Sequence, residues 1–173
     1  MTHPHHQTSR KLGIAIAAGI FVADQLLKYV VTVKLELARW GNIHVLPFFD
    51  FSWVENRGVS MGFLTAESEV SRWLLVSFTA TIAVIVATWM WRERRRGDVM
   101  SLGLVLGGAA GNILDRIRFG YVVDFLDLHI GEWRPFLIFN VADAAITIGV
   151  LLLLLRALLS RSDRRPDGSF NDA

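Results

Sequence analysis

Three aspartates lie near the ends of apolar segments in the second half of this chain. Asp124 and Asp127 belong to GYVVDFLDL (120–128), and Asp143 belongs to FNVADAAITIG (139–149). Ionised carboxylates at a membrane boundary cost free energy, which makes a functional role the first hypothesis. Two carboxylates in one site favour a state with one proton, in which the ionised member activates water and the neutral member polarises an amide carbonyl. Such a pair could hydrolyse a peptide bond without a covalent intermediate.

The residue pattern favours Asp124 and Asp143 as this pair. Asp124 follows two β-branched valines, so an extended strand would present it, and Asp143 lies in the first turn of the last apolar segment. Asp127 is an alternative near the membrane interface. Asp115 is expected to form half of an ion pair with the adjacent Arg116. Spacing alone leaves the choice among these aspartates open.

Further polar side chains gather at the ends of the same apolar segments. Asp24 and Lys28 are four residues apart, which places them on one helix face with the acid before the base. They form either a self-neutralising structural pair or a means of ordering a nearby site. The other polar residues, at helical spacing on two later segments, are Asn112, Asp115, Arg116, Asn140 and Asp143.

A competing motif is GVSMG (58–62), which fits the G-x-S-x-G pattern of a nucleophilic serine. That motif requires a strand-to-helix turn and a histidine base. Outside the N-terminal tail the histidines are His44 and His129, and the sequence places no obvious acidic partner beside either. The tract THPHH (2–6) is interpreted as incidental. The sequence therefore predicts an aspartate mechanism with no metal and no cofactor.

Four apolar segments are long enough to hold these residues at a membrane. A helix needs about 20 residues to cross the hydrocarbon core, and the segments 12–33, 73–91, 99–117 and 139–159 approach or reach that length. They predict an all-α membrane protein with four transmembrane helices, folded as a single polytopic domain over 1–173. Gly103, Gly107 and Gly111 form a ridge on the third segment that lets another helix approach closely.

The loop 34–72 between the first two segments is long and has its own pattern. Its central part, HVLPFFDFSWVENRGVSMGFL (44–64), is rich in aromatic and β-branched residues. This composition predicts two short strands with a turn at ENRG (55–58), where Gly58 can adopt a positive φ. Long loops with their own structure are often functional.

The distribution of charge predicts the orientation in the membrane. Ten of the 18 Lys and Arg residues lie in the N-terminal tail, in WRERRRGD (91–98) and toward the C-terminal end, 156–173. The positive-inside rule then places both termini, including the tail 160–173, in the cytoplasm. RERRR is thus interpreted as a topology signal, with no nucleic-acid partner. The chain has no cysteine, which excludes disulfides and thiolate catalysis.

Four segments together resemble lipoprotein signal peptidase, or signal peptidase II: DQLLK (24–28), NRGVSMGFL (56–64), GGAAGNILDRIRFGYVVDFLDL (107–128) and FNVADAAITIG (139–149). The likeness extends from Leu12 to Leu159. It implies an aspartyl endopeptidase of the bacterial cytoplasmic (inner) membrane. Such an enzyme cleaves the signal peptide of diacylglyceryl-modified prolipoproteins immediately before the lipidated cysteine, and globomycin-type inhibitors block it.

The resemblance also implies roles for individual residues. The catalytic pair falls on Asp124 and Asp143, and the loop 34–72 is expected to form a small β-rich cradle on the outer membrane surface. The supporting residues that it implies are Asp24, Lys28, Asn56, Gly58, Asn112, Asp115, Arg116 and Asn140. Where the family often has two alanines and an aromatic residue, this chain has Val59, Ser60 and Met61, which affects the expected shape of the substrate groove.

A small ion-coupled transporter is the alternative function for four helices with buried ionisable residues. It predicts charged groups near the middle of the bilayer and short outer loops. Here the polar residues collect at one end of the segments beside a long loop. This placement favours an enzyme whose scissile bond is held at the membrane boundary by the substrate's lipid.

Overall fold

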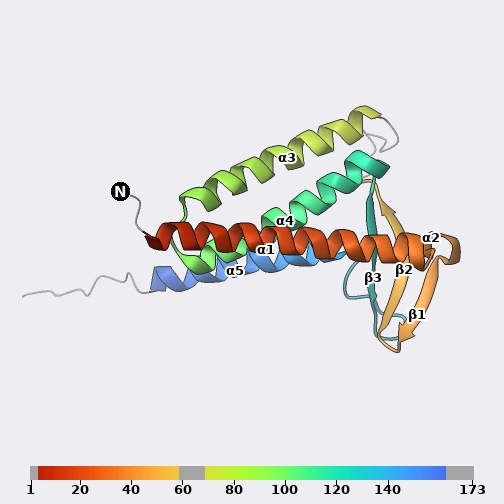
Figure 1. The fold of residues 1–173 in the computed structure, drawn as a ribbon. Helices are drawn as coiled ribbons and strands as arrows, with labels where there is room; N and C mark the ends of the chain where they lie inside the picture. Colours follow the sequence, from red (N-terminus) through yellow and green to blue (C-terminus); the bar gives the residue numbers. More distant parts are fainter. Residues whose placement is uncertain (1–3, 59–68, 163–173) are drawn as a thin grey trace, which may run out of the picture.

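The computed structural model describes residues 4–58 and 69–162 (Figure 1). Four of the helices are long and apolar enough to cross a membrane. The helices are α1 (Pro4–Tyr29), which continues into the π-helical turn η1 (Val30–Lys34), then α2 (Leu37–Trp40), α3 (Glu69–Arg92), α4 (Arg96–Phe119) and α5 (Val141–Ser162). The predicted four-helix membrane fold is confirmed. The fourth transmembrane helix, α5, begins at Val141, two residues later than predicted, because Phe139 forms a β-bridge to Leu126.

Helix α4 is the central helix of the bundle and packs against α1, α3 and α5. The predicted glycine ridge faces α1: a Cβ atom on Gly103 would lie 2.7 Å from the Gly13 carbonyl oxygen, and one on Gly107 would lie 2.5 Å from that of Ala17. In the contact between α4 and α5 the glycine lies on α5: a Cβ on Gly149 would lie 2.6 Å from the carbonyl oxygen of Ser101 in α4. Glycine thus permits backbone-to-backbone packing on both sides of α4.

Three antiparallel strands form a sheet in the order β1-β2-β3 at one end of the bundle (Figure 1). The strands are β1 (Asn42–Leu46), β2 (Phe49–Asn56) and β3 (Val122–Leu128). The prediction of two strands in the first loop is confirmed, and β3 joins them from the segment between α4 and α5. The hairpin turn lies at Pro47 and Phe48, so the prediction of a turn at ENRG is wrong. ENRG instead ends β2, where Gly58 has φ = +93°.

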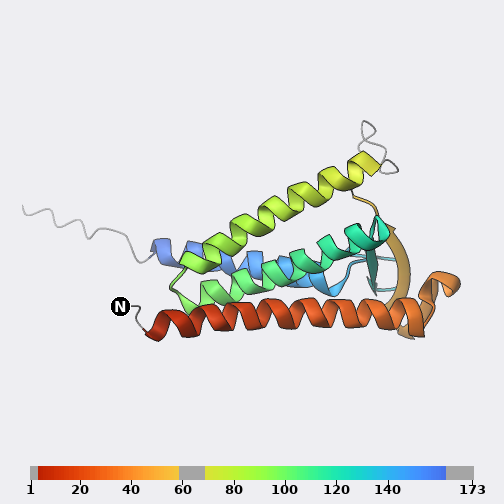
Figure 2. The ribbon, with the colours of Figure 1, turned by 45° about the horizontal axis from the view of Figure 1, so that its top comes forward.

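A small apolar core fixes the sheet to the end of α1. Val31 of η1 and Leu37 of α2 pack with Val123 and Phe125 of β3, and all four side chains are buried. The start of α1 and the end of α5 lie together at the opposite end of the bundle, as both views show (Figures 1 and 2). The molecule therefore has a polar sheet end and a helical end, separated by the length of the apolar helices.

Candidate active site

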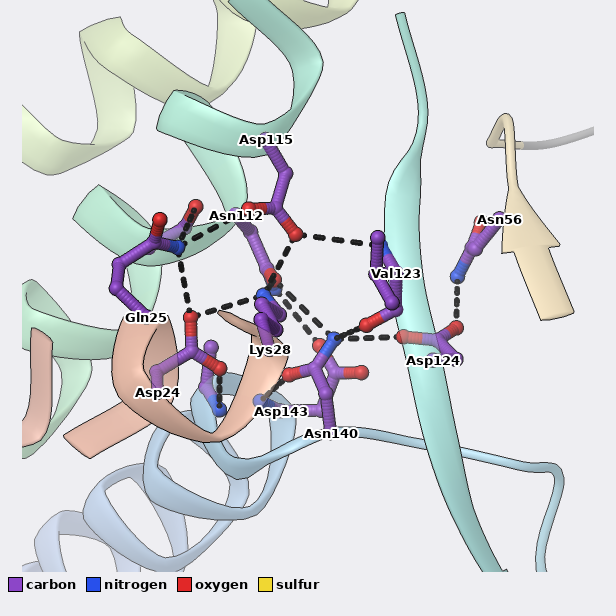
Figure 3. A network of polar contacts seen from close by, with 12 residues as sticks. Asp24, Gln25, Lys28, Asn56, Asn112, Asp115, Val123, Asp124, Asn140 and Asp143 are labelled. Carbon is purple, nitrogen blue, oxygen red and sulfur yellow. Dashed lines mark hydrogen bonds and ion pairs between the residues drawn. The ribbon is translucent and has the colours of Figure 1, made fainter. Parts of the chain in front are cut away.

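Asp124 is buried in the middle of β3 and holds two hydrogen bonds. Its Oδ2 accepts from Asn56 Nδ2 at 3.0 Å, and its Oδ1 accepts from Asn140 Nδ2 at 2.6 Å. The first donor lies on the neighbouring strand β2, and the second lies just before α5. The extended backbone predicted for VVD thus presents this carboxylate toward the start of α5 (Figure 3).

Asp143 stands in the first turn of α5, next to the residue that caps the helix. Asn140 precedes the helix, and its Oδ1 accepts from the backbone N–H of Asp143 at 2.9 Å, the usual N-cap arrangement. The Asp143 Oδ1 accepts from Asn112 Nδ2 at 2.8 Å. Asn140 also donates to Asn112 Oδ1 at 3.3 Å. Two asparagines therefore connect Asp124 and Asp143 through one buried network (Figure 3).

Lys28 lies behind this network and pairs with two buried carboxylates. Its Nζ is 2.8 Å from Asp24 Oδ2 and 2.7 Å from Asp115 Oδ2. The predicted pair of Asp24 and Lys28 is confirmed. The prediction that Asp115 pairs with Arg116 is wrong, because adjacent residues on a helix point in different directions and Asp115 faces α1. Asp115 also accepts a hydrogen bond from the backbone N–H of Val123 in β3.

The contacts of Gln25 and of the Ala142 backbone N–H in this network were not predicted from the sequence. Gln25 Nε2 donates to Asp115 Oδ1 at 3.0 Å and to Asp24 Oδ2 at 3.2 Å. The Asp24 Oδ1 accepts from the backbone N–H of Ala142 at 3.0 Å, so α1 supplies a second cap to the N-terminus of α5. The only sequence indication of the first contact is the position of Gln25 beside Asp24; no sequence pattern indicates the second.

Arg116 is the second cation of the cluster. Its guanidinium interacts electrostatically with the carboxylates of Asp143, Asp124 and Asp115, and its buried Nε has no hydrogen-bond partner among the described residues. The described part of the cluster holds four carboxylates, those of Asp24, Asp115, Asp124 and Asp143, against two cations. This excess of negative charge favours retention of one proton.

The surroundings of Asp124 favour its protonated form. Burial, followed by the negative charge of Asp143, raises the pKa of Asp124 to about 6, although the hydrogen bonds from Asn56 and Asn140 act in the opposite direction. Asp143 is half-buried and lies in the first turn of α5, where the helix dipole stabilises negative charge. The arrangement can therefore hold one neutral and one ionised carboxyl group.

An apolar cavity of about 280 Å³ opens beside Asp143. Its lining includes Phe136, Leu137 and Phe139 from the segment before α5, and Ile148 from α5 itself. Asp143 is the charged residue in this lining. The site thus brings a carboxylate to the edge of a space suited to apolar chains.

The remaining candidates lie elsewhere or outside the described residues. Asp127 is three residues from Asp124, so it points to the opposite face of β3; it accepts from Ser52 Oγ at 3.0 Å and from Arg134 Nε at 3.2 Å. Ser60 and most of GVSMG are not among the described residues. The sequence placed no obvious acidic partner beside His44 or His129, but in the structure both histidines lie beside Asp50.

Comparison with known proteins identifies the family. The family model of signal peptidase (SPase) II matches residues 16–159. The chain belongs to the signal peptidase II family. It is 59% identical over 157 residues to a lipoprotein signal peptidase of Rhizorhabdus wittichii, with 91% of each chain covered, and 55% identical to one of Sphingopyxis alaskensis, with 86% of each covered.

A solved bacterial membrane enzyme has the same fold as this signal peptidase II chain. The two superpose with a TM-score of 0.74 at 28% identity, covering 89% of this chain and 92% of the other. Family membership makes the chain a membrane-bound protease. The alternative of a small ion-coupled transporter receives no support from these relatives.

Proposed function

We propose that this enzyme hydrolyses the amide bond before the diacylglyceryl-modified cysteine of prolipoproteins, with Asp124 and Asp143 as its catalytic pair. The observation that carries the proposal is the bridge between the two carboxylates. Asn140 donates a hydrogen bond to Asp124 at 2.6 Å, and Asn112 donates one to Asp143 at 2.8 Å. Asn140 also donates to the side-chain oxygen of Asn112. Both carboxyl groups are therefore held by rigid elements on either side of one site.

The proposed reaction needs one proton on the pair. The ionised carboxylate of Asp143 takes a proton from water as the water oxygen attacks the scissile carbonyl carbon. The protonated Asp124 gives its proton to the carbonyl oxygen, which yields a neutral tetrahedral intermediate. Collapse of this intermediate breaks the C–N bond. The proton on Asp143 passes to the leaving amine of the cysteine, and Asp124 takes back a proton from one hydroxyl of the intermediate, so that the carboxylic acid forms and the pair regains its starting state.

The surroundings of the pair fit a lipid-anchored substrate. The cavity beside Asp143 is lined mainly by apolar side chains and would seat an apolar part of the substrate or of a globomycin-type inhibitor. Membrane lipid would allow the substrate to enter sideways with its acyl chains still in hydrocarbon. Arg116, whose guanidinium interacts electrostatically with both aspartates and has an unpaired Nε among the described residues, would hold the substrate backbone with its planar fork of donors.

We further propose the orientation in the bacterial inner membrane. Both termini and the loop between α3 and α4 face the cytoplasm, and the sheet and the aspartate pair lie near the outer face. The clustering of Lys and Arg at one end of the bundle supports this orientation. The chain, 1–173, would form one polytopic membrane domain in which the sheet is an extramembrane part and not a separate unit.

The direct test is cleavage of a purified prolipoprotein by the purified protein in detergent. The substrate is offered in two forms, with and without the diacylglyceryl group on its cysteine, and globomycin is added to a parallel reaction. We expect cleavage of the lipidated form alone, and inhibition by globomycin. Equal cleavage of both forms would contradict the proposed substrate, because the apolar cavity would then have no role in recognition.

A further inference from the structure

Three side chains converge at the end of the sheet that holds the β1–β2 turn. His44 lies on β1, Asp50 lies on β2 and His129 directly follows β3. One possible ligand atom from each residue lies within 4.8 Å of the others. His44 Nδ1 is 2.6 Å from Asp50 Oδ1, and His129 Nε2 is 3.3 Å from Asp50 Oδ2.

His129 is the unusual member of this cluster. Its side chain is 11% exposed, and both of its ring nitrogens are buried without a hydrogen bond to any of the described residues. Its Nε2 lies 3.3 Å from Asp50 Oδ2, within ion-pair distance when the ring is protonated. A buried polar atom without a partner costs about 1–3 kcal/mol. The His129 imidazole is therefore placed to bind an ion through a ring nitrogen, together with His44 and Asp50.

We propose that His44, Asp50 and His129 bind a divalent transition-metal ion, with Zn²⁺ as the best fit. Two imidazoles and one carboxylate supply the nitrogen and oxygen donors that zinc prefers, and they leave a fourth position for water. Zinc bonds of about 2.0–2.2 Å place tetrahedral ligand atoms about 3.3 Å apart. The His44 side chain is 66% exposed, so it is free to make the small movement that closes the cluster to this spacing.

The carboxylate of the proposed site is already oriented by neighbouring polar groups. Asn42 Nδ2 donates to Asp50 Oδ2 at 3.3 Å and to Ser52 Oγ at 2.7 Å. Ser52 Oγ in turn donates to the buried Asp127 at 3.0 Å. Outer hydrogen bonds of this kind hold metal ligands in place and raise affinity.

The proposed metal site is separate from the aspartate pair. Asp50 is paired with Asp127 across the sheet, and Asp127 points to the face opposite Asp124. An ion bound here would join β1, β2 and the residue after β3. It would thereby fix the start of the segment that leads to Asn140 and lines the cavity. Its role would be structural, and it would be an exception to the sequence prediction of no metal.

The test measures metal binding by the full-length protein, purified with a tag that contains no histidine and stripped with a chelator. Zn²⁺ is titrated against a chromogenic chelator, and Co²⁺ is titrated while its visible absorption is recorded. We expect one equivalent to bind, with the intense absorption of four-coordinate Co²⁺ and a rise in Tm. His44→Gln and His129→Gln should each lower the affinity by about tenfold or more.

The matched control replaces the three histidines of the N-terminal tail, His3, His5 and His6, with alanine and should leave the affinity unchanged. His44→Gln is the more secure variant, because the His44 side chain is exposed, and the Tm without metal checks the fold of each protein. Absence of stoichiometric binding would overturn the proposal. Binding that survives in both glutamine variants, or that disappears in the tail variant, would also overturn it.

Discussion

At the scale of single residues, Asn140 combines a structural and a chemical task. Its Oδ1 caps α5 through the backbone N–H of Asp143, while its Nδ2 donates to Asp124. The amide thus sets the position of both carboxyl groups relative to one helix terminus. A carboxylate at this position would add a further negative charge to a cluster that already has an excess, which explains why an amide suits the site.

The first prediction concerns the pair itself. Asp124→Asn and Asp143→Asn should each abolish cleavage of the lipidated substrate, because asparagine preserves the shape but cannot exchange a proton. Positioned acid and base groups typically supply about 10²–10⁴-fold in rate, and groups that act as a unit can cost more when one is lost. The measurement is the single-turnover rate with purified variants. Both variants should remain folded, since removal of one carboxylate reduces repulsion.

Asp127→Asn is the matched control for these variants. It lies on the same strand and is equally buried, but it points away from the pair and contacts Ser52 and Arg134. We expect nearly unchanged turnover and a lower Tm, since a charged partner of Arg134 is lost. Turnover close to the parental rate in the Asn variant at 124 or 143 would rule out the proposed mechanism.

A second prediction follows from the raised pKa of Asp124, about 6 in place of the ordinary 3.8. The proton leaves Asp124 as the pH rises through about 6, so kcat/KM should fall by up to about tenfold per pH unit above this value. Because Asp124 is easier to protonate in the folded state, its stabilising contribution is complete below pH 3.8 and is lost as the pH rises through about 6.

The pH dependence is measured with two readouts, kcat/KM and Tm, on the parent protein and on Asp143→Asn. Removal of the Asp143 charge should lower the pKa of Asp124, so the fall in Tm should begin at a lower pH in this variant. A parental kcat/KM that stays level from about pH 6 to about pH 8 would be inconsistent with an essential proton on Asp124.

The third prediction tests the geometry of Arg116. Arg116→Lys keeps the positive charge near both aspartates but replaces the planar fork of donors with a single ammonium group. We expect the cleavage rate to fall by at least about tenfold with little change in expression or Tm, since one charge-assisted hydrogen bond is worth about 1.5–3 kcal/mol. Full activity in the lysine variant would show that charge alone is needed at this position.

At the scale of elements, α4 determines how closely the helices that carry the site approach one another. Gly103 and Gly107 contact α1, and Gly111 lies where a Cβ would meet Asp24 Oδ2 at 2.5 Å. The same face of α4 then continues into Asn112 and Asp115, which bond to the site residues. The glycine ridge therefore sets the depth at which the polar residues of α1 and α4 meet.

The fourth prediction is that Gly107→Val destabilises the bundle. A Cβ at this position would lie 2.5 Å from the Ala17 carbonyl oxygen, so α1 and α4 must separate. Overpacking of this kind typically costs about 1–3 kcal/mol. The readouts are Tm in detergent and cleavage rate, and both should fall. Gly19→Val is the matched control on α1, because nothing lies within 4 Å of its Cβ position, and it should behave like the parent.

At the scale of the whole molecule, the two ends of the bundle differ in chemistry. The sheet lies at one end of the long helices (Figure 1). The aspartate pair and the cavity belong to this end, and arginines mark the other. There Arg10 Nε donates to the Trp91 carbonyl oxygen at 2.9 Å, and Arg156 lies 3.4 Å from Asp98. Because the number of spans is even, the start of α1 and the end of α5 both lie at this arginine-rich end, in agreement with their proposed cytoplasmic location.

The fifth prediction tests this orientation. The chain has no cysteine, so single cysteines introduce no background. A thiol reagent that does not cross the inner membrane is added to cells whose outer membrane alone has been permeabilised. It should label Glu132→Cys, in the segment after β3, and not Ser160→Cys near the end of α5. Lysis of the cells should expose Ser160→Cys to the reagent. Labelling of Ser160→Cys alone in intact cells would reverse the proposed topology.

The sequence by itself determined the four spans, because the thickness of the bilayer converts directly into a length of apolar helix. It also indicated most of the polar residues of the site, since an ionisable group in an apolar segment is costly and stands out. The pairing of Asp24 with Lys28 and the glycine ridge followed from helical periodicity, which is local. The motif likeness added Asn56 and Gly58 as supporting residues and pointed to the same two aspartates, Asp124 and Asp143.

Contacts between distant segments were decided only by the tertiary structure. Asp115 pairs with Lys28 of α1, and not with its neighbour Arg116, because helix packing and not sequence separation chooses the partner. The strand β3 joins the hairpin of the first loop, although more than 60 residues separate it from β2. His44, Asp50 and His129 meet for the same reason: three strands bring their ends together, and hydrogen bonding between strands leaves no periodic trace of that meeting in the sequence.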